Sequence, residues 1–448
     1  MLRRGCCAVR KKIEQLKVEL YAILPPEQIA ALLDSGSEMA RKEVEAMVRR
    51  LATSGRARVA ARSEREKLVA LTVSEILGLG VIDALLDDAS VTEIMVNGPE
   101  KIFYEREGKT FLSPDTYSCE EQLRTTIDRI VSPLGRRIDE QNPMVNGRLP
   151  AGHRVNAVIP PISLSGSLLT IRKFSEKTLS LAELVCSGSV HEGLAALLSW
   201  AVGATQNIAV SGGTGSGKTT LLNALSLEIP SDERIITIED SAELKFSTHP
   251  HVLSLEARPP NLEGKGEISL RDLVINSLRM RPDRIVVGEV RGAEALEMLQ
   301  AMNTGHDGSL TTLHANSPRE VVTRLITMVG YGVEQSQAQV EAQIAAALDL
   351  IVHVQRCSDG LRRIVEVAEL LPADSCTMAE IGENTSKVGA SIVLRSIYRF
   401  EQTGTHEDGR VAGKHHFMHV PQFVDSLVSR NLASGEELDI WQREFAHA

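Results

Sequence analysis

Eight consecutive residues, 212–219, have the composition of a loop that binds nucleotide phosphates. They read Gly-Gly-Thr-Gly-Ser-Gly-Lys-Thr, so glycine occupies four of the first six positions. An apolar run, residues 207–211, comes before them, and a helix-like stretch, residues 219–227, comes after. In this setting glycines let backbone N–H groups turn toward anionic oxygens, and the helix N-terminus adds a favourable dipole. The sequence therefore predicts a site for a nucleoside triphosphate.

Two side chains in this stretch have defined chemistry in phosphate loops. Lys218 is expected to reach the terminal phosphates, and the hydroxyl of Thr219 is expected to ligate Mg²⁺. The predicted cofactors are therefore ATP and Mg²⁺. The predicted nucleotide-binding residues are Gly212, Gly213, Thr214, Gly215, Ser216, Gly217, Lys218, Thr219 and Thr220, joined by His306 and His314 for reasons given below.

A carboxylate suited to activate water ends a later apolar strand. Residues 284–289 read Arg-Ile-Val-Val-Gly-Glu, and Glu289 lies 71 residues beyond Lys218. At the C-terminal end of a parallel strand it would face the nucleotide and orient or deprotonate the attacking water. Most motors of this kind have Asp then Glu here. This chain has Gly288 then Glu289, so a single carboxylate must serve the metal, alone or through a water. The alternative to a catalytic role is that Glu289 is a glutamate at the end of a strand that only faces solvent.

Acidic residues also end another apolar strand, residues 234–239. Glu239 closes this strand, and Asp240 and Glu243 follow it. We expect the strand to lie beside the strand of the phosphate loop, which would place Glu239 near the water that attacks the γ-phosphate. The alternative is that these acids cap a helix. Two strands of one sheet that both end in acids favour the catalytic interpretation.

Residues 304–314 contain several hydroxyl side chains and two histidines. Zinc binding is disfavoured because neither a cysteine nor a third histidine has suitable spacing. A neutral imidazole can donate a hydrogen bond and relay a change of shape, so His306 and His314 are interpreted as sensors of the γ-phosphate. For each of them a structural role in the core is the alternative.

Three arginines, Arg148, Arg154 and Arg172, lie on or beside strands of the N-terminal half. Charge that develops on a phosphate during its transfer is often neutralised by an arginine from another domain or subunit. Arg154 and Arg172 are the candidates for that role. The alternative is an ordinary charged side chain in solvent.

Strands and helices alternate beyond residue 205, at 207–211, 219–227, 234–239, 269–280, 284–288, 293–303, 309–313 and 318–329. This alternation predicts an α/β fold with a parallel sheet and crossover helices. Before it we expect a helical N-terminal extension over 1–70 and a smaller α/β domain over 71–187 with a hairpin turn at Asn97-Gly98. The phosphate-loop domain would cover 188–448, with a less regular tail past 370 and a polar loop at 401–415.

The bulk composition excludes several classes of protein. A net charge of −10 and an aromatic content of 3% argue against direct binding of nucleic acid. Six cysteines are scattered without a CxxC spacing, which fits a reducing compartment. No apolar run approaches the roughly 20 residues that span a bilayer, and the N-terminus lacks the features of a signal peptide. A cytoplasmic protein is expected.

Together these patterns resemble the type II/IV secretion ATPase superfamily. Its Walker A, aspartate, Walker B and histidine boxes match residues 212–219, 234–243, 284–289 and 304–316. Within it the chain is most similar to the tight-adherence (Flp) pilus assembly ATPase of the CpaF-like branch. That likeness is carried by residues 78–80, 91–98, 135–140, 154–161, 170–174, 278–284 and 299–306. Residues 146–154 depart from the branch, because two of its acids are replaced by Asn146 and Ala151.

The resemblance implies a RecA-like P-loop NTPase domain preceded by the smaller α/β domain, assembled as a homohexamer. ATP would lie between the two domains of a protomer, where Arg154 and Arg172 would reach it, and Glu289 would act on water with help from Glu239. Hydrolysis would power pilus assembly or protein secretion through inner-membrane platform proteins. The ATPase would contact pilin or export substrate only indirectly, and would associate peripherally with the membrane through its partners.

Three alternatives remain open. One is the ATPase of a type IV secretion system for conjugation or effector delivery, which differs in its cargo. The second is a nucleic-acid motor on the same core, which stimulation by single-stranded DNA would reveal. The third is an ATP-bound scaffold or switch that hardly turns over.

Overall fold

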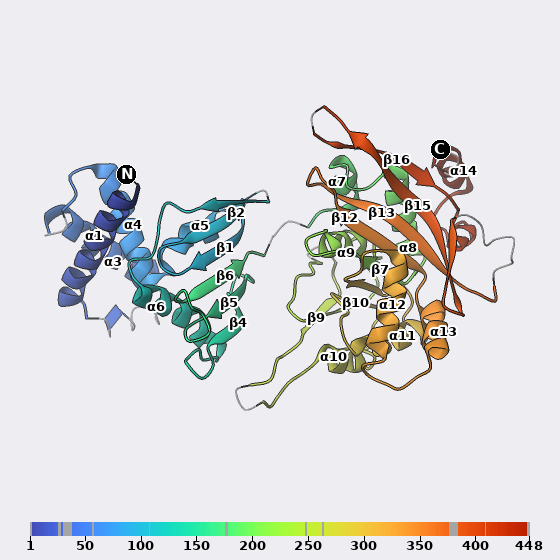
Figure 1. Ribbon diagram of the computed structural model, residues 1–448, viewed down its shortest axis with the longest axis horizontal. Helices are drawn as coiled ribbons and strands as arrows, with labels where there is room; N and C mark the ends of the chain where they lie inside the picture. The colour runs from blue at the N-terminus through green and yellow to red at the C-terminus, as the bar shows by residue number, and fades with distance from the viewer. Residues whose placement is uncertain are drawn as a thin grey trace. The chain divides into compact units, whose positions relative to one another are not determined.

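The computed structural model describes residues 2–25, 28–29, 38–55, 58–106, 108–174, 178–246, 249–261, 264–375, 384–407 and 409–445. Contacts divide the chain into two compact units, Met1–Glu176 and Lys177–Ala448, each of which is described by itself (Figure 1). This division falls earlier than the domain boundary that we placed between residues 187 and 188. The reason is α7 (Leu181–Cys186), whose Leu181 and Leu184 are buried in the core of the second unit.

Helices begin the first unit, as the sequence predicted. They are α1 (Leu2–Ile23), α3 (Glu38–Ser54) and α4 (Arg62–Leu77). Leu16 and Leu20 of α1 are fully buried, and α1 ends two residues before Pro25. A buried ammonium connects these helices to the rest of the unit: Lys17 Nζ lies 3.0 Å from Glu75 Oε2 on α4 and donates to Gln122 Oε1 at 2.8 Å on α6 (Glu120–Val131).

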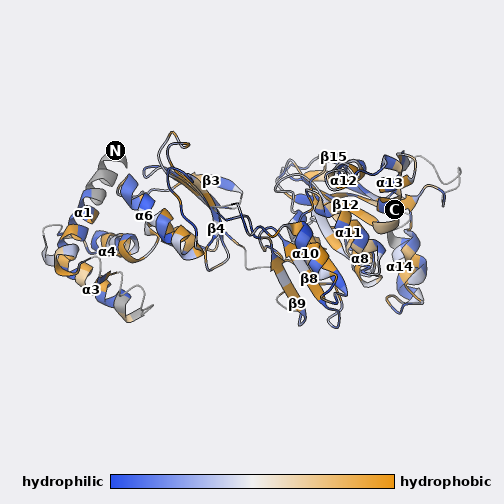
Figure 2. Cartoon of the chain, turned by 90° about the horizontal axis from the view of Figure 1, so that it is seen from below, coloured by the Kyte–Doolittle hydropathy of each residue, from blue (hydrophilic) through white to orange (hydrophobic). Residues whose placement is uncertain are grey.

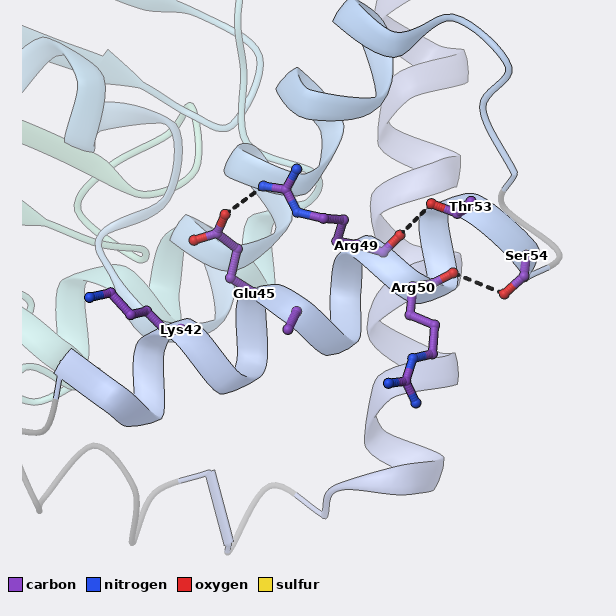
Figure 3. A pocket seen from close by; sticks show the side chains of 7 residues that line it. Lys42, Glu45, Arg49, Arg50, Thr53 and Ser54 are labelled. Carbon is purple, nitrogen blue, oxygen red and sulfur yellow. Dashed lines mark hydrogen bonds and ion pairs between the residues drawn. The ribbon is translucent and has the colours of Figure 1, made fainter.

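The outer side of α3 has a shallow groove, lined by Lys42, Glu45, Ala46, Arg49, Arg50, Thr53 and Ser54 (Figure 3). Arg49 pairs with Glu45 at 2.7 Å and with Glu66 of α4 at 2.6 Å. The hydroxyls of Thr53 and Ser54 donate to backbone carbonyls one turn earlier in the same helix. Most polar groups in the groove are therefore satisfied within this pair of helices.

A six-stranded antiparallel sheet forms the rest of the first unit, in the order β3-β2-β1-β6-β5-β4. Its strands are β1 (Val91–Asn97), β2 (Ile102–Arg106), β3 (Lys109–Leu112), β4 (Met144–Arg148), β5 (Arg154–Val158) and β6 (Leu168–Arg172). The β1–β2 turn at Asn97-Gly98 is confirmed, and Gly98 adopts a φ of +74° that favours glycine. The unit also contains η1 (Gly80–Ile82), α5 (Asp83–Asp87) and η2 (Ser132–Leu134).

No single helix among the described residues has both the length and the apolar composition to cross a membrane. The helices at residues 62–77 and 80–87 are bent by 112° relative to each other. Only when they are taken together do they have the length and apolar composition of a membrane span.

The second unit is built on a mostly parallel sheet, in the order β14-β15-β13-β12-β7-β11-β10-β8-β9, with β16 beside β15. Strands β12, β7, β11, β10, β8 and β9 run parallel, and β13 to β16 add antiparallel partners. The strands are β7 (Ile208–Ser211), β8 (Ile235–Glu239), β9 (Val252–Glu256), β10 (Arg284–Val287), β11 (Leu310–Leu313), β12 (Leu350–Arg356), β13 (Arg362–Pro372), β14 (Thr385–Val388), β15 (Ile392–Thr405) and β16 (Val411–Phe417). This is the RecA-like α/β fold that the sequence predicted.

Helices cover both faces of this sheet. The helices are α8 (Glu192–Gly203), α9 (Lys218–Ser226), α10 (Leu270–Ser277), α11 (Glu294–Asn303), α12 (Pro318–Val329), α13 (Gln337–Ala347) and α14 (Gly435–Phe445), with η3 (Gln422–Ser426). Successive strand residues serve opposite faces: Ile208 packs with α8 and α9, whereas Ala209 packs with α10 to α13. Figure 2 shows hydrophobic residues along the central strands and on the helices beside them.

Two predictions about this unit were wrong. Strand β8 does not lie beside β7; β7 pairs with β11 and β12, and β8 pairs with β9 and β10. The polar residues 401–415 are not a loop either, since most of them form the outer part of the antiparallel pair β15 and β16. The β15 residues of that part, 401–405, are all exposed, so this end of the strand lacks the apolar alternation that marks a half-buried strand.

Asn207 joins the beginnings of three strands at the edge opposite the phosphate loop. Its backbone N–H donates to Asp349 Oδ2 at 2.7 Å, its Nδ2 donates to the Ala347 carbonyl at 2.7 Å, and its Oδ1 accepts from Ser309 N at 2.9 Å. The residues before β7, β11 and β12 are therefore tied together through one side chain.

Asp349→Asn is expected to stabilise the protein by up to about 3 kcal/mol near pH 8 and by little near pH 4. Burial, with Asp307 and Glu369 nearby, raises the pKa of Asp349 from 3.8 to about 6, although the Asn207 hydrogen bond opposes this. An acid whose folded-state pKa is raised destabilises the fold above that pKa, and the penalty fades as the pH falls toward the unfolded value. Urea unfolding of the parent and the variant at both pH values measures the change in the free energy of unfolding. An equal change at the two pH values, or a lower stability of the variant near pH 8, would contradict the prediction.

Candidate active site

Two glycines of the phosphate loop, Gly212 and Gly217, lie where a side chain has no room. The loop leaves the buried strand β7 at Gly212, where an added Cβ would overlap the carbonyl oxygen of Val354 on β12. Gly217 precedes α9 with a φ of +99°, and its Cβ would come within 2.9 Å of Arg362 Cδ. Gly213, Thr214 and Gly215 are exposed between these two points. The loop therefore presents its backbone to solvent at the C-terminal edge of the sheet.

Lys218, the first residue of α9, folds back over this loop. Its Nζ donates to the carbonyl oxygens of Gly212 at 3.0 Å and Gly213 at 2.9 Å. The residue is buried, and burial lowers the pKa of its ammonium although the charge of Glu289 opposes this. A cationic group thus lies against the loop mouth, where a terminal phosphate is expected.

Backbone hydrogen bonds on both sides hold Glu289 in place, just beyond the end of β10. The N–H of Gly288 donates to Ile238 O on β8 at 2.9 Å. On the other side, Thr312 Oγ1 of β11 donates to Gly288 O at 2.7 Å, and Val290 N donates to Thr312 O at 2.8 Å. The backbone is fixed while the Glu289 side chain keeps 32% of its surface exposed, which is the arrangement a base needs.

His314, which follows β11, connects the acid to the lysine. Its Nε2 lies 2.9 Å from Glu289 Oε1, and each ring nitrogen lies 3.5 Å from Lys218 Nζ. Burial and the charge of Lys218 lower the pKa of His314, while Glu289 raises it. A neutral imidazole donates Nε2–H to Glu289 and keeps Nδ1 as an acceptor. The structure thus brings together Lys218, Glu289 and His314, three of the predicted site residues.

Glu239 is buried at the end of β8 and fixes the following loop. Its Oε1 accepts from the backbone N–H groups of Glu243 at 2.7 Å and Leu244 at 3.0 Å. An added Cβ on Gly288 would lie 2.8 Å from Glu239 Cγ. Glycine at position 288 therefore has a steric reason: a side chain there would require the buried Glu239 side chain to move.

His306 is not brought to this edge of the sheet. It precedes β11, whereas His314 follows it, so the two histidines lie at opposite ends of the same strand. Ser309, whose hydroxyl donates to His306 O at 2.8 Å, lies at the N-terminal edge: its backbone N–H donates to Asn207 Oδ1 at 2.9 Å, and its carbonyl accepts from Ile208 N at 3.1 Å. Within the second unit His306 is therefore remote from the phosphate loop, a separation that the sequence interpretation did not foresee.

The remaining loop residues fit a triphosphate and its metal. Ser216 is 3% exposed, and its Oγ has no hydrogen-bond partner among the residues that the structure describes. Thr219 and Thr220 are half-buried in the first turn of α9, where helix N–H groups point outward. Exposed loop amides, a lysine, a threonine and a nearby carboxylate are the donor set expected for ATP with Mg²⁺.

The three arginines of the first unit form a row across its sheet. Arg148 of β4 is opposite Arg154 of β5, and Arg154 is opposite Arg172 of β6. Residues directly opposite in an antiparallel pair share a face, so like charges gather there. Arg172 has a carboxylate nearby, with its Nε 3.8 Å from Glu93 Oε1. This row is a cationic surface, and its approach to a nucleotide stays a prediction.

Sequence reasoning missed two arginines near the site. Arg291, two residues after Glu289, forms an ion pair with Asp240 at the end of β8. Arg362, at the start of β13, touches the phosphate loop. The short spacing from Glu289 was a usable signal for Arg291, whereas nothing local marks Arg362.

The fold and the site define a RecA-like P-loop NTPase. Residues 75–407 match the family model described as "Type II/IV secretion system protein", and the chain belongs to this family.

Similar proteins include a conjugal transfer protein and proteins of type IV secretion systems. The conjugal transfer protein TrbB of Rhizobium radiobacter is 36% identical over 289 residues, which cover 64% of this chain and 85% of TrbB. The type IV secretion system protein VirB11 of Bartonella quintana is 31% identical over 325 residues, covering 64% of this chain and 90% of VirB11. The crystal structure of the VirB11 ATPase from the Brucella suis type IV secretion system, in complex with sulphate, matches with 30% identity and a TM-score of 0.35; it covers 64% of this chain and 95% of that chain.

Proposed function

We propose that this protein is an ATPase that hydrolyses ATP to power a secretion or pilus assembly machine at the inner face of the cytoplasmic membrane. The observation that carries this proposal is the cluster of Lys218, His314 and Glu289 at the mouth of a glycine loop. The cluster unites a phosphate-binding cation with a held, partly exposed carboxylate. That pairing is what hydrolysis of a phosphoanhydride requires.

Each side chain has one task in this proposal. Lys218 binds the terminal phosphates together with the amides of residues 212–219. Glu289 accepts the proton of the attacking water, and His314 holds its carboxylate in position through the 2.9 Å contact. Thr219, with Glu289 acting through a water, would hold Mg²⁺, which would supply positive charge to the phosphates. Glu239 assists by fixing the loop after β8 through the backbone N–H groups of Glu243 and Leu244.

The arginine row of the first unit is proposed to complete the site. Arg154 and Arg172 would neutralise charge on the γ-phosphate in a homohexameric ring, and the row of like charges supports an affinity for anions. A change in the angle between the two units during turnover would then transmit work to inner-membrane platform proteins and, through them, to pilin or an export substrate.

Two branches of the family compete for the biological role. The sequence motifs resemble the tight-adherence pilus branch, whereas the relatives described above are named for conjugal transfer and type IV secretion. Those names favour the second candidate, an ATPase of a type IV system for conjugation or effector delivery. Deleting the gene and scoring pili, conjugation and effector delivery in parallel separates the two candidates.

Lys218→Ala is expected to abolish both ATP binding and ATP hydrolysis in the purified protein. The substitution removes the only ammonium described against the loop mouth and leaves two loop carbonyls without their donor. Calorimetry with a non-hydrolysable ATP analogue and a phosphate-release assay measure the two losses. Parent-like binding and turnover in this variant would sink the proposal, and stimulation of the parent by single-stranded DNA would favour a nucleic-acid motor.

A further inference from the structure

A cationic turn borders the phosphate loop on the side away from Glu289. Strand β12 pairs with β7 on one side and with β13 on the other, and residues 357–361 connect β12 to β13. Since β12 is parallel to β7, its C-terminal end lies at the same edge of the sheet as the loop. Arg356 ends β12 and Arg362 begins β13.

Arg362 makes two contacts with the loop. Its Nε donates a hydrogen bond to the carbonyl oxygen of Gly215 at 3.0 Å. Its aliphatic stem covers Gly217: a Cβ added to that glycine would lie 2.9 to 3.7 Å from the Cβ, Cγ and Cδ atoms of Arg362. This hydrogen bond fixes the peptide between Gly215 and Ser216, whose N–H donates to Gly213 O at 3.3 Å. Arg362 therefore holds the turn of the loop from this side, and loop amides are the groups that bind phosphate.

Arg356 and Arg362 are directly opposite each other across the antiparallel pair. Like charges in this position destabilise a sheet, because the side chains share one face. Both residues are exposed, and neither forms an ion pair with a carboxylate within the described part of the chain. An anion bound beside them would relieve this repulsion. The pairing of two unneutralised arginines is thus an independent indication of an anionic ligand.

The turn that presents these arginines is rigid. Asp359 accepts two hydrogen bonds from Arg363, at 2.9 and 2.7 Å, and one from the backbone N–H of Val411 at 2.9 Å. Within the turn, Cys357 N donates to Leu361 O at 2.8 Å and Gly360 N donates to Cys357 O at 2.9 Å. Arg362 is therefore held against the loop by its surroundings and need not be ordered when a ligand binds.

We propose that Arg362, with Arg356 opposite it, forms a second cationic element of the site, which positions the phosphate loop and raises its affinity for the polyphosphate chain of a nucleotide. The proposal rests on the proposed function, since it names a further residue of the same site. Arg362 acts through the Gly215 carbonyl and is a positioning residue. Arg356 contributes through its charge alone.

The test compares affinities for a non-hydrolysable ATP analogue by calorimetry, at low and at moderate salt. Arg362→Gln is expected to weaken binding about tenfold or more, because a charge-assisted hydrogen bond and a nearby positive charge are both lost. Arg356→Gln should weaken binding only a few-fold and mainly at low salt, since it removes charge without touching the loop. Arg362→Lys should fall between the parent and Arg362→Gln.

Arg443→Gln supplies the matched control, because Arg443 is exposed on α14 and, among the described residues, donates to Asp439 O of its own helix. Steady-state kinetics add a second readout: KM should rise in Arg362→Gln while kcat changes little, and the melting temperature should stay near that of the parent. Parent-like binding by Arg362→Gln, or equal losses in all three Gln variants, would overturn the inference. A parent protein that binds no nucleotide would instead overturn the proposed function, and Lys218→Ala marks the baseline for that outcome.

Discussion

Glu289→Gln should bind ATP about as well as the parent and hydrolyse it about 100-fold to 10,000-fold more slowly. Glutamine has the same shape and keeps an oxygen that can accept the hydrogen bond from His314 Nε2, now 2.9 Å from Glu289 Oε1. The clamp of Gly288 and Val290 by Thr312 does not involve the replaced group. What the amide cannot do is take a proton from water. The loss should therefore appear in kcat and not in the affinity for nucleotide.

Phosphate release under saturating ATP measures the rate, and calorimetry with the non-hydrolysable analogue measures the affinity. Glu334→Gln is a suitable control, because it is the same chemical change outside the site. Glu334 is exposed in the segment between α12 and α13. A kcat within about threefold of the parent would show that another group activates the water. In cells the variant should also stop pilus formation or secretion; unaffected export would favour the scaffold or switch interpretation.

Local patterns explain what the sequence could predict about this site. The phosphate loop, Lys218 and Glu289 belong to short segments in which a strand, a turn and a helix follow directly, and each segment contains its own signal. His314 was predicted from the composition of its segment, since residues 304–314 are rich in hydroxyl side chains and contain two histidines. Elements read from hydrophobic periodicity, such as β10 and α12, agree with the structure to within one or two residues.

The order of strands in the sheet is not a local property, and the errors follow from that. We expected β8 next to β7, but β11 and β10 lie between these two strands. The correct order depends on where each crossover helix returns to the sheet, which no local pattern reveals. His306 shares a motif with His314, yet β11 carries them to opposite edges. Arg362 reaches the phosphate loop from a strand 144 positions beyond Lys218, through pairing of β12 with β7 that no spacing reveals.

Gly308→Ala is expected to destabilise the protein by about 3–5 kcal/mol, although the residue lies in a motif that we interpreted as a phosphate sensor. An added Cβ at Gly308 would overlap the guanidinium of Arg284, which is completely buried at the start of β10. Arg284 cannot move away cheaply: Nη1 donates to Gly308 O at 3.1 Å, Nη2 donates to Val202 O at 3.0 Å, and the side chain forms an ion pair with Glu233. Displacing it would leave a buried charge with weaker partners.

Gly305→Ala separates this clash from backbone strain. Both glycines adopt a positive φ, +92° at Gly305 and +80° at Gly308, so each substitution carries the left-handed penalty of about 1–2 kcal/mol. An added Cβ at Gly305 has no described atom within 4 Å, so this penalty is its whole expected cost. Urea unfolding of the two variants measures the difference. Equal losses would contradict a packing role for Gly308, whereas a larger loss for Gly308→Ala places the glycine of this motif in the support of β10, whose far end leads to Glu289.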